Sequence, residues 1–365
     1  MYPFIRPTIP PPEAWLDLLA PAYEERRYSN FGPVASRLKR ELEQKYASPE
    51  HSVVLVSSGT AGLIAALLAL EVHGAVAMPS FTFPATASAV MLARCTPLFL
   101  DVSPETWELD IAQLEQVLQR QRVGAILHVR TLGLCHPLDD LERLAQSFGV
   151  PLIVDSAASL GGREPSGASV GGSGDAEIFS LHATKVFGVG EGGAVFVRKH
   201  LAERLRKTIN FGLADGVPEV LGFNGKLSEV HAAIGLAVLK RIDGFIARRG
   251  EIARGYRARL EQDAALEHAP NAGAPPWQTY PVALPGNADP VVEQLVAAGV
   301  GVRRYYAPPL HRTPPFAADV SLPVTDDLSA RMICLPVYSD MSDRELDEIV
   351  DIANRVLAPA FERSA

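Results

Sequence analysis

One lysine of the chain stands in a setting that favours covalent chemistry. Lys185 ends the segment 179–185, with the sequence FSLHATK, and is followed by a glycine-rich turn at residues 188–193. An amine must lose its proton before it attacks an aldehyde, and a partly dry pocket lowers the pKa of such an amine. Ser180, five residues earlier, carries a hydroxyl that can hold a phosphate. The pattern predicts a Schiff-base lysine, and the alternative is an ordinary lysine on a surface loop.

A carboxylate at the end of an apolar run is a suitable partner for such a lysine. Asp155 directly follows the residues LIV at 152–154. If the lysine carries pyridoxal phosphate (PLP), this carboxylate would keep the pyridine nitrogen protonated and make the ring an electron sink. Ala157 is small enough to lie against one face of the ring, and Phe83 can stack on the other. The alternatives are a carboxylate that caps the next turn and a phenylalanine in the core.

The start of an apolar helix supplies a predicted anion site. Ser58, Gly59 and Thr60 follow a strand and open this helix, so the free amides, the helix dipole and the Thr60 hydroxyl can hold a phosphate. The alternative is a plain N-cap. The literal GxGxxG at 188–193 precedes a strand instead of opening a helix, which argues against a dinucleotide site. The nine histidines form no HxxxH or HExxH pattern, so we predict no metal site.

Composition narrows the class of protein. The chain has 365 residues, of which 47% are hydrophobic and 21% charged, as in an enzyme with one large and one smaller domain. The net charge of −8 argues against a nucleic-acid partner. Cys95, Cys135 and Cys334 form no CxxC pair, and no apolar run is long enough to cross a membrane. We therefore expect a cytoplasmic protein without a disulfide framework, a signal peptide or a membrane partner.

Strands and helices alternate in the first half of the chain. The predicted strands are 51–56, 75–78, 97–101, 124–128, 151–155, 177–180 and 194–198, and the predicted helices are 34–46, 58–72, 83–93, 111–122 and 138–148. Repeated β-α units with continuous apolar strands indicate a mostly parallel sheet covered by helices on both faces.

The remaining segments predict an N-terminal arm and a second domain. A helix is expected at 13–27, and a long helical stretch at 227–260 that breaks near Gly244 or Gly250. Farther on, the expected strands are 278–284 and 300–303, and the expected helices are 289–298 and 342–357. We expect a large domain with its N-terminal arm in residues 1–240 and a small α+β domain in residues 241–365.

Five motifs, in their order along the chain, resemble one family of enzymes. They are SSGTA at 57–61, PSFTFPAT at 79–86, DSAA at 155–158, FSLHATK with GEGG at 179–185 and 190–193, and GFNGKLSE with AAIGL at 222–229 and 232–236. The set is similar to the DegT/DnrJ/EryC1/StrS family of PLP-dependent sugar aminotransferases. The resemblance is strongest from residue 28 to residue 249 and continues more weakly to the end. It implies an α/β architecture of the aspartate aminotransferase type, called fold type I.

The resemblance also implies roles for individual residues. Lys185 would form the Schiff base with PLP and carry a proton, and Asp155 would pair with the pyridine nitrogen. The other implied cofactor contacts are Phe83 on the ring, Gly59, Thr60 and Ser180 on the phosphate, and Asn224 on the phosphate of the neighbouring subunit's cofactor. We therefore expect a homodimer with shared active sites.

The sequence also suggests candidate substrate residues, for each of which a surface or packing role is the favoured alternative. They are Tyr28, Asn30, His182, Lys226, Tyr306 and His311. Two positions depart from the family. Ala158 stands where a glutamine or histidine usually contacts the ring oxygen, and Lys226 stands where arginine, with its bidentate fork, is common.

The implied reaction transfers an amino group from glutamate or glutamine to a nucleotide-linked keto sugar, with pyridoxamine phosphate as the intermediate form of the cofactor. Dehydratases of the family carry histidine in place of the lysine, so Lys185 favours transamination. The lysine segment most resembles members that aminate C4 of a dTDP-4-keto-6-deoxyhexose. The alternatives are an aminotransferase of keto-cyclitols and a regulatory protein that kept the fold without catalysis.

Overall fold

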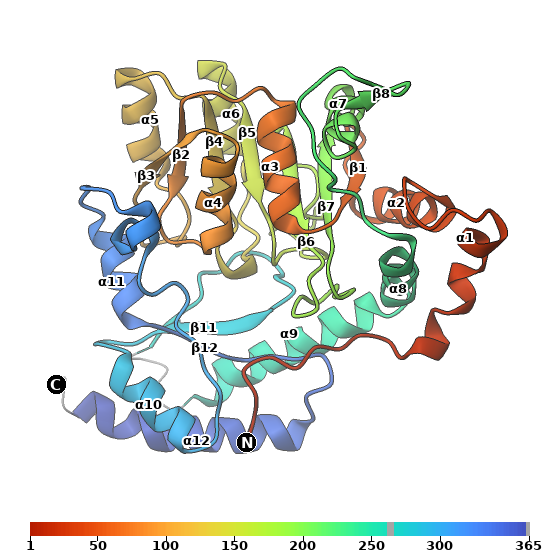
Figure 1. The fold of residues 1–365 in the computed structure, drawn as a ribbon. Coiled ribbons are helices and arrows are strands. Elements are labelled where there is room, and N and C mark those ends of the chain that lie inside the picture. Colours follow the sequence, from red (N-terminus) through yellow and green to blue (C-terminus); the bar gives the residue numbers. More distant parts are fainter. Residues whose placement is uncertain (261–265, 363–365) are drawn as a thin grey trace.

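A seven-stranded sheet forms the centre of the computed structural model, which describes residues 1–260 and 266–362 (Figure 1). The strands are β1 (His51–Val56), β2 (Ala75–Pro79), β3 (Thr96–Leu100), β4 (Ala125–Val129), β5 (Leu152–Asp155), β6 (Ala176–Ser180) and β7 (Gly193–Arg198). Their order is β1-β7-β6-β5-β4-β2-β3, and only β7 runs antiparallel to its neighbours in this sheet of the described residues. The mostly parallel sheet predicted from the sequence is confirmed.

Helices cover both faces of this sheet because successive strand residues point to opposite sides. On one face, Val54 and Val56 pack in a core with α3, α4 and α7, whereas on the other face Val53 and Leu55 pack with α2 and α8. Helices α5 and α6 cover the parallel strands on this second face. The bounds are α2 (Pro33–Tyr46), α3 (Gly59–Ala69), α4 (Pro84–Leu92), α5 (Ile111–Arg120), α6 (Asp139–Phe148), α7 (Lys199–Thr208) and α8 (Glu229–Leu239).

A smaller antiparallel sheet lies below the central sheet in Figure 1. Its strands are β10 (Glu267–His268), β11 (Thr279–Ala283) and β12 (Met332–Pro336), and it is accompanied by α9 (Ile242–Arg259), α10 (Asp289–Ala297), α11 (Pro323–Arg331) and α12 (Asp343–Glu362). Tyr256, Tyr280 and Ile349 are buried together in its core. The expected domain boundary at residue 240 falls between α8 and α9, and the two-domain division stays a prediction, with residues 261–265 and 363–365 outside the described part.

Two helix predictions differ from the structure. In place of one helix over 13–27, the chain forms the short turns η1 (Pro12–Ala14) and η2 (Asp17–Leu19) and the helix α1 (Ala20–Glu24). Pro21 explains the interruption because it has no N–H to bond back to the preceding turn. The helical stretch 227–260 does break, but the break lies at residues 240–241, between α8 and α9. The two glycines at which a break was predicted, Gly244 and Gly250, both lie within α9.

The predicted strand at 300–303 is wrong, although both of its ends make single bridges. Val300 pairs with Tyr2 of the N-terminal segment, and Arg303 pairs with Cys334 of β12. The chain therefore changes partner within four residues and forms no continuous ladder. Several elements of the structure were not predicted from the sequence. They are helices α7 and α11, strands β10 and β12, and the small hairpin of β8 (Leu213–Ala214) and β9 (Val217–Pro218).

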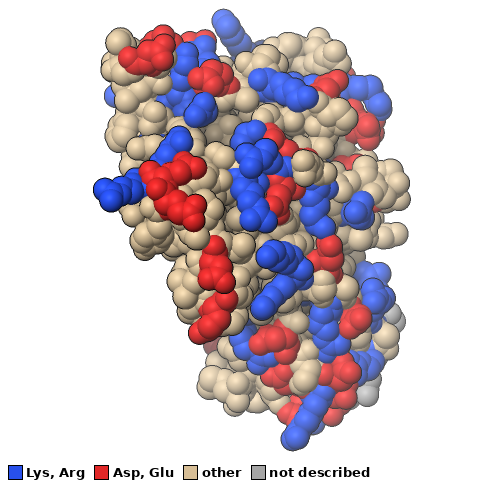
Figure 2. All heavy atoms as spheres, turned by 90° about the vertical axis from the view of Figure 1, so that its right-hand side faces the viewer, with Lys and Arg blue, Asp and Glu red and all other residues tan. Residues whose placement is uncertain are grey.

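The surface carries charges of both signs. Figure 2 shows acidic and basic side chains interspersed on the face that includes α1 and α8. Every helix within the described residues is too short or too polar to cross a membrane. The three cysteines are buried and free.

Candidate active site

The topology gathers the predicted residues at one edge of the central sheet. Strand β1 points the same way as β6, because two antiparallel steps through β7 restore its direction. The ends of β1, β2, β5 and β6 therefore meet at the carboxyl edge, where ligands of open α/β sheets bind. A cavity of about 460 Å³ opens there, between this edge and residues of the C-terminal part.

Lys185 lies in this cavity, on the loop that joins β6 to β7. Its backbone N–H bonds to the carbonyl of His182 at 2.8 Å, which holds the lysine in a tight turn. Burial lowers the pKa of Lys185 to about 8, and the nearby carboxylate of Asp155 partly opposes this effect. An amine in this state supplies a sizeable neutral, nucleophilic fraction at neutral pH.

Asp155 faces the same cavity from the end of β5, held by two hydrogen bonds. The Thr86 hydroxyl donates to Oδ2 at 2.9 Å, and the amide of Ala157 donates to Oδ1 at 3.2 Å. Since a hydroxyl has one proton to donate, Thr82, whose hydroxyl is 2.9 Å from that of Thr86, donates to Thr86 in turn. Burial raises the pKa of Asp155, and these donors act against the rise.

The start of α3 and the end of β6 form an anion cradle, defined here as the amides of Gly59 and Thr60 with the Ser180 hydroxyl. Ser58 caps the helix by accepting the amide of Ala61 at 3.1 Å, so the amides of Gly59 and Thr60 remain at the cavity wall. A Cβ on Gly59 would lie 3.2 Å from the Cβ of Ser180, so glycine permits the close approach. The cradle combines N–H donors, a hydroxyl and a helix dipole.

The walls of the cavity beside Asp155 are an aromatic ring and two small residues. Phe83 precedes α4 and its side chain is 54% exposed, so it is not a core residue, which was the alternative for it. Ala157 and Ala158 line the cavity on the turn after β5. A flat ring fits between an aromatic face and small side chains. Ala158 brings no polar atom of its side chain where the family usually has glutamine or histidine.

His182 lines the cavity next to the lysine loop. The amide of Thr184 donates to His182 Nδ1 at 3.3 Å, which makes Nδ1 an acceptor and places the ring proton on Nε2 in the neutral form. Nε2 lies 3.6 Å from Oε1 of Glu191, an exposed residue that also lines the cavity. The pair presents one basic and one acidic group to a substrate.

Of the two candidate substrate residues in the C-terminal part, Tyr306 lines the cavity and His311 does not. Tyr306 lines the cavity with its ring edge-on to Phe81 at 5.2 Å, and burial together with the charge of Asp155 raises its pKa. His311 is buried outside the cavity, where its Nδ1 is 2.8 Å from the Ser80 hydroxyl and its Nε2 is 3.2 Å from Asp326. In this structure His311 holds two segments together and does not reach the cavity.

The structure places the other four predicted residues away from the cavity of their own chain. Tyr28 packs edge-on against Tyr23 at 5.1 Å, and Asn30 lies in the turn before α2. Asn224 pairs with Asn210 in a β-bridge, and Lys226 Nζ donates to the side chain of Asn210 at 2.8 Å. Their roles in binding stay predictions.

Several residues of the site were missed as site residues, among them Ile5, Gln278 and Arg303, which line the cavity, and Thr86, which bonds to Asp155. For Thr86 a signal existed, because a hydroxyl in the first turn of the helix after Phe83 points toward the same edge. Arg303 lies within a segment that resembles the family's C-terminal lining, but nothing in the sequence separates it from Arg304. Ile5 and Gln278 reach the cavity only through tertiary packing, which has no sequence signal.

A larger hollow of about 650 Å³ lies at the opposite edge of the sheet, beside α6 and β7. Its two arginines are paired with carboxylates, Arg198 with Asp175 and Glu50 and Arg143 with Asp140. In the described ranges, no three His, Cys, Asp or Glu side chains are grouped as metal ligands. The cavity with Lys185 is therefore the candidate active site.

The cavity fits PLP in its chemistry. Lys185 offers an amine of lowered pKa for the aldehyde, and the anion cradle offers donors for the phosphate. Among the described residues, the side chain of Asp155 receives hydrogen bonds only from neutral donors, so it can still accept a bond from a protonated pyridine nitrogen. Phe83 and Ala157, which line the same cavity, offer an aromatic face and a small side chain for contact with the ring.

Comparison with known proteins gives consistent matches over almost the whole chain. The DegT/DnrJ/EryC1/StrS aminotransferase family matches residues 14–354. Protein Rv3402c of Mycobacterium tuberculosis is 35% identical, over 95% of this chain and 88% of that protein. The dTDP-4-amino-4,6-dideoxy-D-glucose transaminase of Shigella dysenteriae is 28% identical, over 96% of this chain and 98% of that enzyme.

Solved structures agree with the fold. A Bacillus cereus protein assigned as a PLP-dependent aminotransferase superposes with a TM-score of 0.91 at 28% identity, covering 96% of this chain and 99% of that one. DesI, crystallised in the presence of its TDP-sugar product, superposes with a TM-score of 0.89 at 30% identity, covering 100% of this chain and 96% of that one. These matches confirm both the predicted fold type and the resemblance drawn from the five motifs.

Proposed function

Because this chain belongs to the DegT/DnrJ/EryC1/StrS aminotransferase family and is a PLP-dependent aminotransferase, we propose that it transfers an amino group from glutamate or glutamine to a nucleotide-linked keto sugar. We propose further that the sugar is a dTDP-4-keto-6-deoxyhexose. The observation that carries the proposal is that Lys185 and Asp155 share one cavity with the anion cradle. The Shigella transaminase and DesI support the sugar class, since both names refer to dTDP- or TDP-linked sugars.

Lys185 has two tasks in this proposal. Bound PLP supplies an aldehyde for covalent attachment and a ring that takes up an electron pair. Lys185 Nζ is the amine that anchors the cofactor, and once freed it takes a proton and returns it. Its lowered pKa of about 8 lets Nζ do both near neutral pH. A positioned acid/base of this kind contributes about 10²–10⁴ in rate.

Asp155 and the anion cradle hold the cofactor at its two ends. The Asp155 carboxylate, fixed by Thr86 and the amide of Ala157, would keep a proton on the ring nitrogen. The amides of Gly59 and Thr60 and the Ser180 hydroxyl would bind the phosphate. Phe83 would cover one face of the ring, and Ala157 the other. Together these contacts fix the ring relative to Lys185.

We also propose a homodimer in which Asn224 serves the neighbouring cofactor site. Asn224 and Lys226 lie outside the cavity of their own chain. Asn224 forms a β-bridge with Asn210, and Lys226 donates a hydrogen bond to the side chain of Asn210. Mixing Lys185→Ala chains with Asn224→Ala chains tests this. If the sites are shared, the mixed dimer contains one intact site and activity returns. No recovery from inactive parent dimers would show that Asn224 acts in its own chain, and full activity of Asn224→Ala by itself would show that Asn224 has no role.

A panel of substrates tests the reaction itself. Glutamate and glutamine are offered as donors with nucleotide-linked 4-keto and 3-keto sugars and with keto-cyclitols, and the amine products are identified by mass spectrometry. We expect amination of the dTDP-4-keto-6-deoxyhexose. Amination of keto-cyclitols alone would replace the proposal with the cyclitol alternative.

A further inference from the structure

Two arginines on the cavity wall differ in how their charge is balanced within the described residues. Arg130 is fully buried and paired with Glu177 at 3.1 Å and Glu164 at 3.0 Å. Arg303 has an exposed side chain, and within the described part of the chain no carboxylate lies at ion-pair distance from it. Arg303 is therefore the cavity arginine with a charge available for a ligand.

The position of Arg303 is fixed at both ends of the residue. Its backbone pairs with Cys334 of β12, with N···O distances of 2.7 and 3.3 Å. Its guanidinium lies over the ring of Phe4, 5.6 Å from the ring centroid, and Phe4 packs edge-on against Tyr305 at 5.9 Å. A cation above an aromatic face is attracted by the ring without losing its charge. The guanidinium also bonds to the side chain of Tyr305, and a guanidinium has five N–H donors, so it is held in place with donors left for a ligand.

Phe4 belongs to an N-terminal arm, residues 1–8, that is tied to the C-terminal part. The amide of Tyr2 bonds to Gly299 and that of Gly301 to Tyr2, at 2.7 and 2.8 Å. A Cβ on Gly301 would lie 2.6 Å from the amide nitrogen of Phe4, so the close approach requires glycine there. Ile5, the next residue, lines the cavity.

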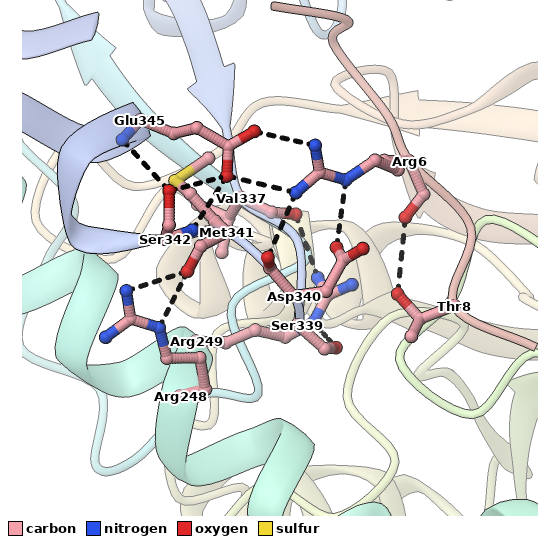
Figure 3. Close-up of polar contacts among 10 residues, drawn as sticks. All are labelled: Arg6, Thr8, Arg248, Arg249, Val337, Ser339, Asp340, Met341, Ser342 and Glu345. Carbon is pink, nitrogen blue, oxygen red and sulfur yellow. Dashed lines mark hydrogen bonds and ion pairs between the residues drawn. The ribbon is translucent and has the colours of Figure 1, made fainter. Parts of the chain in front are cut away.

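Arg6 fastens the other end of the arm. Figure 3 shows its guanidinium between Asp340 and Glu345, at 2.9 and 2.7 Å. The same group lies over the ring of Tyr338, 4.1 Å from the centroid. The hydrogen bond from Arg6 lowers the pKa of Glu345 to about 2, so the pair stays charged at neutral pH. The arm is therefore anchored on both sides of Phe4.

We propose that Arg303 binds an anionic oxygen group of a substrate and that the N-terminal arm, through Phe4 and Arg6, positions it. A guanidinium donates two parallel N–H bonds to a carboxylate or a phosphate. The inference rests on the proposed function, which offers two sources of such a group. These are the carboxylate of the amino donor and the diphosphate of the nucleotide sugar.

Separate half-reactions distinguish the two sources. The absorbance of the bound cofactor follows each half-reaction by itself. Glutamate alone converts pyridoxal phosphate to pyridoxamine phosphate, and the keto sugar alone converts it back. Arg303→Gln is expected to raise the substrate concentration for half-maximal rate at least about 10-fold in one half-reaction, as for a lost hydrogen bond to a charged group. Loss with glutamate identifies the carboxylate, and loss with the sugar identifies the diphosphate. Binding of 2-oxoglutarate and of dTDP by calorimetry gives a readout that needs no turnover.

Arg312→Gln is the matched control, because Arg312 belongs to the same segment, pairs with Asp326 at 2.8 Å and does not line the cavity. Unchanged half-reactions and unchanged binding in Arg303→Gln would overturn the inference. A wild-type enzyme that reacts with no amino donor or keto sugar would instead refute the proposed function. The two failures are therefore distinguishable.

Variants of the arm test the positioning role. Phe4→Leu and Arg6→Gln are expected to weaken the same half-reaction as Arg303→Gln, by a smaller factor, with the maximal rate kept. Combining either with Arg303→Gln should add little, because both act through the same group. Equal effects on both half-reactions, or full additivity, would overturn the role of the arm.

Discussion

The two ends of the cavity are built in different ways. At the inner end, Asp155 is buried and accepts a hydrogen bond from Thr86, which is buried behind it. At the outer end, Arg303 and Glu191 are exposed, and Arg303 rests on a ring instead of a carboxylate. The inner end is fixed by strands of one sheet, whereas the outer end collects residues from the arm, the lysine loop and the C-terminal part.

The two ends match two different tasks of an aminotransferase, which are the chemistry at the cofactor and the recognition of substrates. The chemistry at the cofactor is the same for both substrates, so it benefits from groups that do not move. In the proposed reaction, recognition must accept an amino acid and then a sugar nucleotide in one space, which exposed groups with unused hydrogen-bond donors allow. Changes at the inner end should therefore slow both half-reactions alike, and changes at the outer end should affect one of them.

Lys185→Ala should give the largest effect. It removes the anchoring amine and the proton carrier together, so turnover should fall at least about 10⁴-fold in both half-reactions. Absorbance of the cofactor and product formation measure the loss. Lys199→Ala, an exposed lysine in α7, is the control. Full activity of Lys185→Ala would show that another lysine carries the chemistry.

Asp155→Asn should follow, with both half-reactions slowed about 10²–10³-fold. The amide keeps the shape and the bond from Thr86 but cannot hold a proton on the ring nitrogen. Single-turnover absorbance measures each half-reaction, and circular dichroism checks the fold. A loss confined to one substrate would contradict the division between the two ends.

Thr86→Val should slow both half-reactions roughly 10-fold, as for the loss of one hydrogen bond to a charged group. It also leaves Asp155 with one donor fewer, so the pKa of that carboxyl should rise. The acid limb of the pH–rate profile should then move to higher pH. Thr86→Ser keeps the hydroxyl and should restore both properties, and a profile identical for Val and Ser would refute the role.

The pH dependence of cofactor capture tests the state of Lys185. Because burial lowers its pKa to about 8, the neutral fraction rises about five-fold between pH 7 and pH 8 and levels off above pH 9. The rate of absorbance change on adding PLP to the apoenzyme should follow this curve. Between pH 8 and the ordinary lysine pKa the unfolded chain binds more protons, so apoenzyme stability should rise with pH there. A capture rate that keeps rising to pH 10 would mean an ordinary lysine.

The inner end was largely predictable from the sequence and the outer end was not. Asp155, Ser180 and Gly59 each sit where a strand ends, so sheet topology alone brings them to one edge. Ile5, Gln278 and Arg303 reach the cavity from separate segments of the arm and the C-terminal part, whose packing no local pattern encodes. The same contrast holds for the fold, since strands β1 to β7 were predicted but β12, paired across a long connection, was missed.

The approach of Gly59 to Ser180 has a consequence for the amount of enzyme as well as for its rate. These residues come from distant parts of the chain and meet only when β1, β7 and β6 are assembled. An unfolded chain has no such phosphate site, so bound PLP stabilises the folded state alone. At a free concentration 100 times its dissociation constant, the gain is about 2.7 kcal/mol. If the cradle holds PLP as proposed, a larger supply of cofactor should therefore lengthen the survival of the folded protein where unfolded chains are degraded.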